Sequence, residues 1–364
     1  MSDLLIRDVL VIDGTGESPY QGDVSVRAGR IEAVGKLSTN GAQVIDGGGL
    51  VLAPGIIDSH THYDAQITWD AWTTPSVSLG VTSLIMGNCG FGIAPCWEKD
   101  REVTLANLTQ VEGMSLEALT EGTQWSFTSF PEYLDFLESN RVGPNVACYC
   151  GHSSLRMHVM GEAATERLAT NGEVEKMKTL LLDALRAGAC GFSTSTFEGH
   201  NGLGGRPMPS RLADESEIMS LTKILGAHGS GNFMLTKGSK TTMNFLESLA
   251  AESGRPVMVA ALLVDNLNPD RIFRELDAIQ AANERGNSMI GQVSCSPMIM
   301  DFRLNSAYPF EILDTWQQVI PIYSDHERLS TIYASASFRD GVRSDLKRDI
   351  ACLLYTSPSP RDRG

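Results

Sequence analysis

Residues 54–64 read Pro-Gly-Ile-Ile-Asp-Ser-His-Thr-His-Tyr-Asp, and the fold of the chain can be worked out from this stretch. Its apolar first half is typical of a buried strand, and the strand ends in His60 and His62. Residues spaced by two on a strand point to the same face, so both imidazoles lie together at the strand's C-terminal end. In a parallel barrel that end carries the active site, and imidazole is a common ligand of zinc and related metals. The stretch predicts a metal site, with an ordinary polar loop as the alternative.

The pattern of apolar and polar residues before this stretch differs from the pattern after it. Between Leu4 and Leu52, short alternating strands are broken by turns, which predicts a small antiparallel sheet. Beyond Leu52, apolar strands alternate with amphipathic helices, the pattern of βα units around a parallel sheet. The expected strands are 4–12, 23–27, 30–34 and 43–46 in the first part, and 55–59, 82–86, 146–150, 190–193, 233–235, 257–262 and 290–294 in the second. The predicted fold class is α/β, a TIM-type barrel that lacks its last strand unit.

Capping signals mark the helices between these strands. Thr170 with Glu173 has the spacing of a capping box, and Asp214 with Glu217 opens the next helix in the same way. A glycine at position 254 stands where a C-terminal cap belongs, and Pro269 is expected in the first turn of a helix.

Composition limits the classes of function. The 364 residues carry a formal net charge of -15, which disfavours nucleic acid and anionic membranes as partners and favours a small-molecule substrate. No basic segment precedes an apolar run at the start, and no stretch has the apolar length of a membrane span, so we expect a soluble, cytoplasmic protein. Seven cysteines in a chain of this kind are expected to be reduced thiols. The sequence carries no signal for an oligomeric state.

A series of short motifs leads to the histidine pair: Asp13-Gly14-Thr15-Gly16, Asp23-Val24, Gly29-Arg30-Ile31, Val34-Gly35, Val44-Ile45-Asp46 and Pro54-Gly55. Together with His60-Thr61-His62, they resemble the start of the amidohydrolase superfamily, whose members hydrolyse amide, imide and related bonds. The resemblance implies a (β/α)8 barrel with a flanking β-sandwich. We therefore expect a β-sandwich portion over residues 1–52 and a metal-dependent hydrolase barrel over residues 53–351.

The second barrel strand narrows the resemblance. It runs from Gly80-Val81-Thr82 to Gly87-Asn88-Cys89-Gly90, and this is similar to the N-acyl-D-amino-acid deacylase (D-aminoacylase) branch. In that branch a cysteine at this place is a metal ligand that substitutes for a carboxylated lysine, which implies the same role for Cys89. The expected ligand set is His60, His62 and Cys89, and the expected cofactor is zinc, as one or two divalent ions. A buried core thiol is the alternative for Cys89.

The chain departs from the branch at two later strands. The branch usually ends strand five with a metal-binding histidine, but residues 233–238 read Phe-Met-Leu-Thr-Lys-Gly, and strand six over 257–264 also lacks a histidine. The acidic residue that the family places after strand eight would lie beyond Ala351, so no catalytic residue is assigned. Three explanations stay open: one metal on His60, His62 and Cys89, unidentified further ligands, or a remodelled metal site.

Three other residues are candidates for substrate binding. His152 follows the third strand and either lines the pocket, orients a metal ligand or is a structural histidine bonded within its loop. Arg206 and Arg211 lie in the glycine-rich segment Glu198 to Arg211, which resembles a mobile loop over a barrel mouth. Either arginine could clamp a substrate carboxylate with two hydrogen bonds, although solvated loop arginines are commoner.

The last stretch, residues 352–364, resembles the translation of a sequencing-library adapter. An amphipathic segment through Phe338, Val342, Leu346 and Ile350 precedes it, and Pro358 and Pro360 would interrupt that helix. We expect a non-native tail, with a natural disordered tail as the alternative.

The expected function is metal-dependent hydrolysis of a non-peptide carbon–nitrogen bond by metal-activated water, most simply the deacylation of an N-acyl D-amino acid. A cyclic amide or hydantoin hydrolase is an alternative within the enzymes, and a non-catalytic scaffold with this fold is the competing class. Without its eighth strand the chain itself is expected to be inactive, and its open barrel edges to be exposed.

Overall fold

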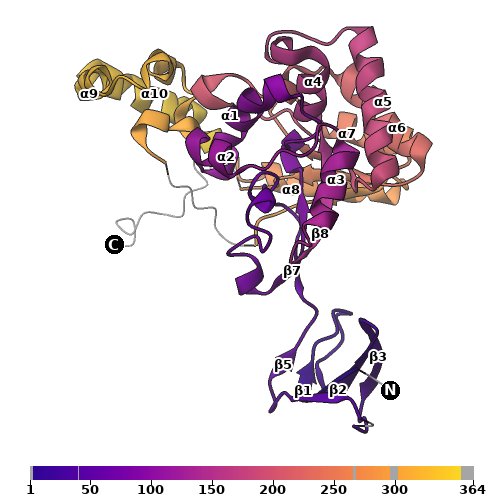
Figure 1. Ribbon diagram of the computed structural model, residues 1–364. Helices are drawn as coiled ribbons and strands as arrows, with labels where there is room; N and C mark the ends of the chain where they lie inside the picture. Colours follow the sequence, from indigo (N-terminus) through magenta and orange to yellow (C-terminus); the bar gives the residue numbers. More distant parts are fainter. Residues whose placement is uncertain (1–2, 40, 265–267, 296–301, 354–364) are drawn as a thin grey trace. The chain divides into compact units, whose positions relative to one another are not determined.

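The protein is described here from a computed structural model (Figure 1). The structure describes residues 3–39, 41–264, 268–295 and 302–353. The chain divides into two compact units. One comprises Met1–Ile57 with Gly80–Thr82, and the other comprises Asp58–Leu79 with Ser83–Gly364.

The N-terminal sheet has five strands: β1 (Leu4–Val11), β2 (Tyr20–Arg27), β3 (Arg30–Gly35), β4 (Gln43–Asp46) and β5 (Val51–Leu52). The order is β3-β2-β1-β4, and β5 also pairs with β1. The β1, β2 and β3 pairings are antiparallel as predicted, but β4 and β5 both run parallel to β1. The prediction of a purely antiparallel sheet was therefore wrong. Strand alternation reports which face is buried and carries no information on strand direction. Val9, Val11 and Val24 form the small core of this sheet.

The second sheet has seven strands, each beside its neighbours in sequence, in the order β12-β11-β10-β9-β8-β7-β6. They are β6 (Ile56–Asp58), β7 (Val81–Met86), β8 (Asn145–Gly151), β9 (Gly191–Ser195), β10 (Asn232–Thr236), β11 (Val257–Ala260) and β12 (Met289–Gly291). The pairings β7–β8, β8–β9, β9–β10, β10–β11 and β11–β12 are all parallel. Every residue of β9 is buried, which is typical of a parallel sheet covered on both faces. The predicted barrel-type α/β fold is confirmed, with β6 and β12 as the edge strands of the described sheet.

One or more α-helices lie between consecutive strands from β7 to β12 (Figure 1). They are α1 (Arg101–Glu112), α2 (Leu116–Gly122), α3 (Phe130–Ser139), α4 (His152–Met160), α5 (Asn171–Ala187), α6 (Glu215–His228), α7 (Met243–Ser253) and α8 (Arg271–Glu284). The apolar stripe of α5 is buried through Met177, Leu181 and Leu185, as its helical spacing predicts.

The helix caps show which of the capping motifs predicted from the sequence form in the structure. Thr170 and Glu173 form the predicted capping box, and Gly254 ends α7 in the left-handed conformation. Asp214 accepts the Glu217 backbone N–H as predicted, but the Glu217 carboxylate is used elsewhere, in a contact with His152 and Arg156. The prediction for Pro269 was wrong, because Asp270 is the N-cap and Pro269 therefore lies outside the first turn of α8.

A separate small core follows in the C-terminal region. It contains Ala307, Leu313, Trp316, Val319, Leu329 and Phe338. The helices α9 (His326–Ala334) and α10 (Ala336–Leu353) contribute to it, and α10 includes the predicted amphipathic segment from Phe338 to Ile350. Of the expected non-native tail, residues 354–364 lie outside the described residues. None of the described helices has both the length and the apolar character needed to cross a membrane.

Candidate metal centre

His60 and His62 follow β6 and are held in place through the residue between them. Thr61 donates from its backbone N–H and from its hydroxyl to the carbonyl oxygen of Ile85 in β7, at 3.0 and 2.8 Å. Because the Thr61 side chain is bonded to β7, the side chains of its two neighbours, His60 and His62, point together to the opposite face. Their ring centroids are 5.3 Å apart in an edge-on arrangement. The prediction that the two imidazoles lie together is confirmed geometrically.

A tight turn after β7 places Cys89 beside them. Gly87, Cys89 and Gly90 all have left-handed backbone conformations, with φ of 73°, 58° and 74°. A Cβ at Gly87 would lie 2.4 Å from the carbonyl oxygen of Tyr149, so only glycine fits against β8 there. Asn88 is buried and donates its amide to the carbonyls of Ile85 and Thr61. These constraints explain the Gly-Asn-Cys-Gly sequence and fix the direction of the cysteine side chain.

The three side chains form a compact donor set. Cys89 Sγ lies 3.1 Å from His60 Nε2 and 3.7 Å from His62 Nε2. Their candidate ligand atoms all lie within 4.8 Å of one another, and within the described ranges this is the one group of three or more His, Cys, Asp or Glu side chains that could hold a metal ion. The spacing suits three ligands of one ion with a position left for water or substrate, as in catalytic zinc sites.

The protonation states of the donors also fit a metal. Burial lowers the pKa of His60 and lowers that of His62 still further, so both rings are neutral near pH 7 and have a lone pair to offer. Burial raises the pKa of Cys89 to about 12, with Asp64 adding to the rise, so without a cation the sulfur keeps its proton. A divalent ion would stabilise the thiolate in this position. The buried Nδ1 atom of His62 also lacks a hydrogen-bond partner in the part of the chain that the structure describes.

Gln292, which comes directly after β12, determines the tautomer of His60. Its amide nitrogen donates to the carbonyl oxygen and the hydroxyl of Ser59, at 3.3 and 3.0 Å. Since a carbonyl can only accept, Gln292 Oε1 must face His60, and it lies 2.7 Å from Nδ1. His60 Nδ1 is therefore the protonated nitrogen, and Nε2 directs its lone pair at the Cys89 side of the site.

Two further residues near the histidines were not predicted. Asp64 is 1% exposed, accepts the Gly87 N–H at 3.1 Å, and burial raises its pKa to about 7. His200 receives or donates a hydrogen bond at Nδ1 with Ser195 Oγ, at 2.7 Å, and packs edge-on against Phe91, which packs in the same way against His62. Burial lowers the pKa of His200 to about 3, with Arg211 and His60 adding to the effect. The sequence carried one signal for each of them. Asp64 stands in the same stretch as the histidine pair, and His200 stands inside the glycine-rich segment.

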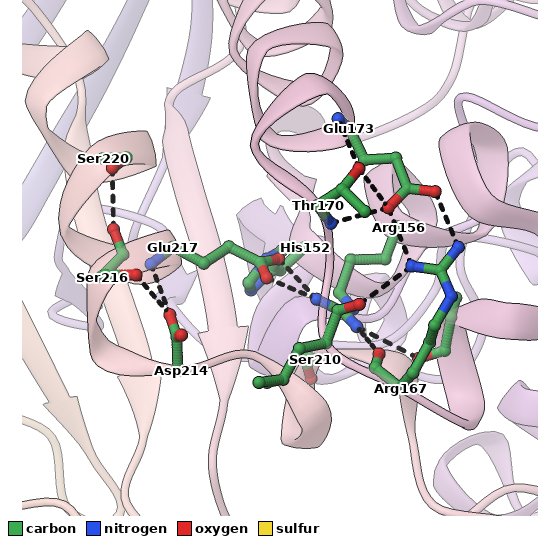
Figure 2. Close-up of polar contacts among 12 residues, drawn as sticks. His152, Arg156, Arg167, Thr170, Glu173, Ser210, Asp214, Ser216, Glu217 and Ser220 are labelled. Atoms are coloured by element: carbon green, nitrogen blue, oxygen red, sulfur yellow. Dashed lines mark hydrogen bonds and ion pairs between the residues drawn. The ribbon is translucent and has the colours of Figure 1, made fainter.

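His152 lies in a group of polar contacts that also includes Arg156 and Glu217 (Figure 2). Its side chain is 0% exposed; Nδ1 bonds to Thr194 Oγ1 and Nε2 to Glu217 Oε1, both at 2.8 Å. Arg156 Nη1 donates to both oxygens of the same carboxylate at 2.6 Å. With both ring nitrogens engaged by buried protein groups, the geometry favours the structural alternative for His152 over contact with a substrate.

The two candidate arginines differ in environment. Arg206 has an exposed side chain. Arg211 is half-buried, donates from Nη1 to the carbonyl oxygen of His200 at 3.2 Å and donates to Asn201 Oδ1. Arg211 thus bonds to the backbone of His200, whose ring packs against Phe91, the neighbour of His62.

Comparison with known proteins identifies the class. The model of the amidohydrolase family matches residues 43–303, and the chain belongs to this family. D-aminoacylase from Alcaligenes xylosoxydans xylosoxydans is 37% identical over 228 residues, which are 62% of this chain and 43% of that protein. The chain thus spans less than half the length of this curated relative. The predicted resemblance to the deacylase branch is confirmed.

Solved structures agree with the sequence match. A structure of D-aminoacylase, described as having a binuclear metal center, has a TM-score of 0.68 and 32% identity, covering 82% of this chain and 59% of that one. A structure of N-acyl-D-glutamate deacylase from Bordetella bronchiseptica, complexed with zinc and a phosphonate inhibitor, has a TM-score of 0.65 and 27% identity, with coverage of 81% and 59%.

Proposed function

We propose that this protein is a metal-dependent hydrolase that deacylates N-acyl D-amino acids, with zinc held by His60, His62 and Cys89. The observation that carries the proposal is the compact group of two imidazoles and one thiol after neighbouring strands β6 and β7. Imidazole nitrogen and thiolate sulfur are both standard zinc ligands, and three protein ligands leave the fourth position that a catalytic zinc site keeps open. The similarity to D-aminoacylase and N-acyl-D-glutamate deacylase supports the substrate class.

A bound zinc ion supplies Lewis acidity and makes hydroxide available near neutral pH. The residues of the chain prepare the site for it. Neutral His60 and His62 offer nitrogen lone pairs, Cys89 contributes one negative charge, and Gln292 fixes which nitrogen of His60 faces inward. The ion and the thiolate together would leave a net charge of +1, which suits an acyl carbonyl that gains negative charge as it is attacked.

Arg211 is the residue that we propose for binding the carboxylate of the amino acid. Its guanidinium is held by His200 and Asn201, so part of its rotamer freedom is already lost before substrate arrives. The exposed Arg206 has no such support in the described contacts and is the weaker of the two candidates.

A cytoplasmic location also belongs to this proposal. Cys148 and Cys150 in β8 and Cys190 just before β9 are neighbouring free thiols, and burial raises the pKa of each. Such thiols persist in a reducing compartment.

The test is acetate release from N-acetyl D-amino acids, with the L enantiomers and a hydantoin as competing substrates. Zinc-loaded and chelator-treated protein are compared, with C89A as the variant without the thiol. Because the described sheet ends at edge strands β6 and β12, residues 1–351 are assayed beside a chimera that carries a relative's eighth-strand segment after Ala351. We expect zinc-dependent release with D selectivity from the chimera, and little or none from residues 1–351. If both proteins bind zinc and release no acetate, the deacylase proposal is wrong, and turnover of the hydantoin alone would favour a cyclic-amide hydrolase.

A further inference from the structure

The sulfur of Cys89 has two occupied sides. On one side are the imidazoles of His60 and His62. On the other, the hydroxyl of Thr236 donates to Sγ at 3.0 Å. Thr236 is the last residue of β10, the fifth strand of the parallel sheet. The contact joins residues 147 positions apart and depends on the way the sheet brings β7 and β10 to a shared interior.

Among the residues that the structure describes, those that follow on this second side are poor metal ligands. Met234 lies two residues before Thr236 in β10 and therefore on the same face of the strand. Its sulfur accepts the Cys89 backbone N–H at 3.3 Å. Lys237, the next residue after Thr236, forms an ion pair with Glu275 at 2.9 Å. The sixth strand, β11, ends in Ala260, which is followed by Ala261. A neutral threonine hydroxyl, a thioether and an alanine cannot replace imidazole or carboxylate as ligands of a hard or borderline divalent ion.

We propose that this chain binds a single divalent ion, on the histidine side of Cys89, and that Thr236 is a positioning residue whose hydroxyl donates a hydrogen bond to the thiolate. This inference rests on the proposed function, because it concerns the same metal centre. The hydroxyl fills the side of the sulfur from which a second ion would approach, so the thiolate binds one ion and does not bridge two. It would also spread the negative charge of the thiolate and hold the sulfur in the direction of the two imidazoles. The chain would differ in this respect from the D-aminoacylase described with a binuclear centre.

The first measurement is the metal content of the full chain after loading with zinc, or with Co²⁺ as a spectroscopic probe, followed by removal of loose ions. We expect one ion per chain. Two tightly bound ions per chain would overturn the single-ion inference and leave the proposed zinc-dependent function intact. A chain that binds no divalent ion would overturn both.

The second measurement tests Thr236 itself. In T236V the side chain keeps its volume and loses the hydroxyl, and T236S keeps the hydroxyl. For T236V we expect one ion per chain, a metal affinity lower by about 10–100-fold, the range known for partners of metal ligands, and a shift of the thiolate-to-Co²⁺ charge-transfer band to lower energy. T236S should keep the band and the affinity of the parent chain. A T236V protein that is folded and has the parent's band and affinity would show that the Thr236 hydroxyl does not act on the thiolate.

Discussion

His60 and Gln292, separated by 232 residues, are joined by a hydrogen bond of 2.7 Å between Nδ1 and Oε1. The bond connects the segments that follow the first and the seventh strands of the parallel sheet. The backbone of Gln292 is itself fixed, because its N–H donates to Val259 and its carbonyl accepts from Leu262, at 2.9 and 2.8 Å. An amide held in this way keeps the imidazole in one tautomer and one orientation.

Replacing Gln292 should therefore weaken metal binding without unfolding the chain. Q292M keeps the length of the side chain and removes the acceptor, and we expect the zinc dissociation constant to rise about 10–100-fold. The measurement is competition with a chelator of known affinity, with circular dichroism as the check on folding. Q292E, which keeps an acceptor for Nδ1, should lose less affinity than Q292M. Equal affinities for Q292M and the parent chain would remove Gln292 from the metal centre.

The two loop arginines give a matched pair for substrate binding. In the chimera with the added eighth-strand segment, R211A should raise KM for an N-acetyl D-amino acid by about 10–200-fold, the effect of losing roughly 1.5–3 kcal/mol of charged hydrogen bonding, with a smaller change in kcat. R206A, from the exposed part of the same loop, should leave both constants unchanged. Steady-state kinetics on the two variants decide between them. If R206A raises KM and R211A does not, the carboxylate is bound by the other arginine.

The buried Glu217 should be important for stability. In E217Q the Arg156 guanidinium, which is 0% exposed, has no carboxylate partner. This uncompensated buried charge should lower the free energy of unfolding by about 3–5 kcal/mol. The control is E173Q, which removes the Arg167–Glu173 pair with side-chain exposures of 47% and 18% and should cost about 1 kcal/mol or less. Urea unfolding of both variants gives the comparison. In R156M/E217Q the loss should be smaller than the sum of the two single losses, since no cation is left unpaired. Equal losses for E217Q and E173Q would contradict a stabilising role of the buried pair.

The same network predicts how stability changes with pH. Burial lowers the pKa of His152 below its ordinary value of 6.5, against the opposing effect of Glu217. Burial acts to raise the pKa of Glu217, but hydrogen bonds and charges from His152 and Arg156 hold it below its ordinary 4.5. Both groups are lowered on folding, so their contribution is fully present above the unfolded pKa values and is lost as pH falls toward the folded ones. The free energy of unfolding should decrease as pH falls below about 6.5.

The check on this pH dependence is the slope of stability against pH between about pH 7 and pH 5 in chelated protein. In H152Q the titrating ring is absent, so the slope should be smaller than in the parent chain, whatever the absolute stability of the variant. An H152Q protein with the parent's slope would show that His152 does not contribute to the acid sensitivity.

Local signals predicted much of the fold and part of the site. The histidine pair and the Gly-Asn-Cys-Gly turn are short segments whose geometry depends on strand period and glycine conformation, and both could be found from sequence. Gln292 and Thr236 could not, because each meets its partner across more than 140 residues through the curvature of the sheet. Glu217 shows the limit of a local motif, since its backbone follows the predicted cap while its carboxylate is taken by Arg156 and His152. The predicted direction of β4 and β5 was wrong for a similar reason. The path of the chain decides whether two strands pair in parallel or antiparallel, and the alternation of side chains does not report that path.

The most direct test of the central proposal is X-ray absorption at the zinc K-edge of the zinc-loaded chain. The ligand set His60, His62 and Cys89 predicts one sulfur at about 2.3 Å and two imidazole nitrogens at about 2.0–2.1 Å, with any remaining position taken by a lighter atom. The sulfur contribution should disappear in C89S, and one imidazole should be lost in H62A. Zinc that is bound by the parent chain with no sulfur in its first coordination shell would contradict the assignment of Cys89 and the metal centre proposed here.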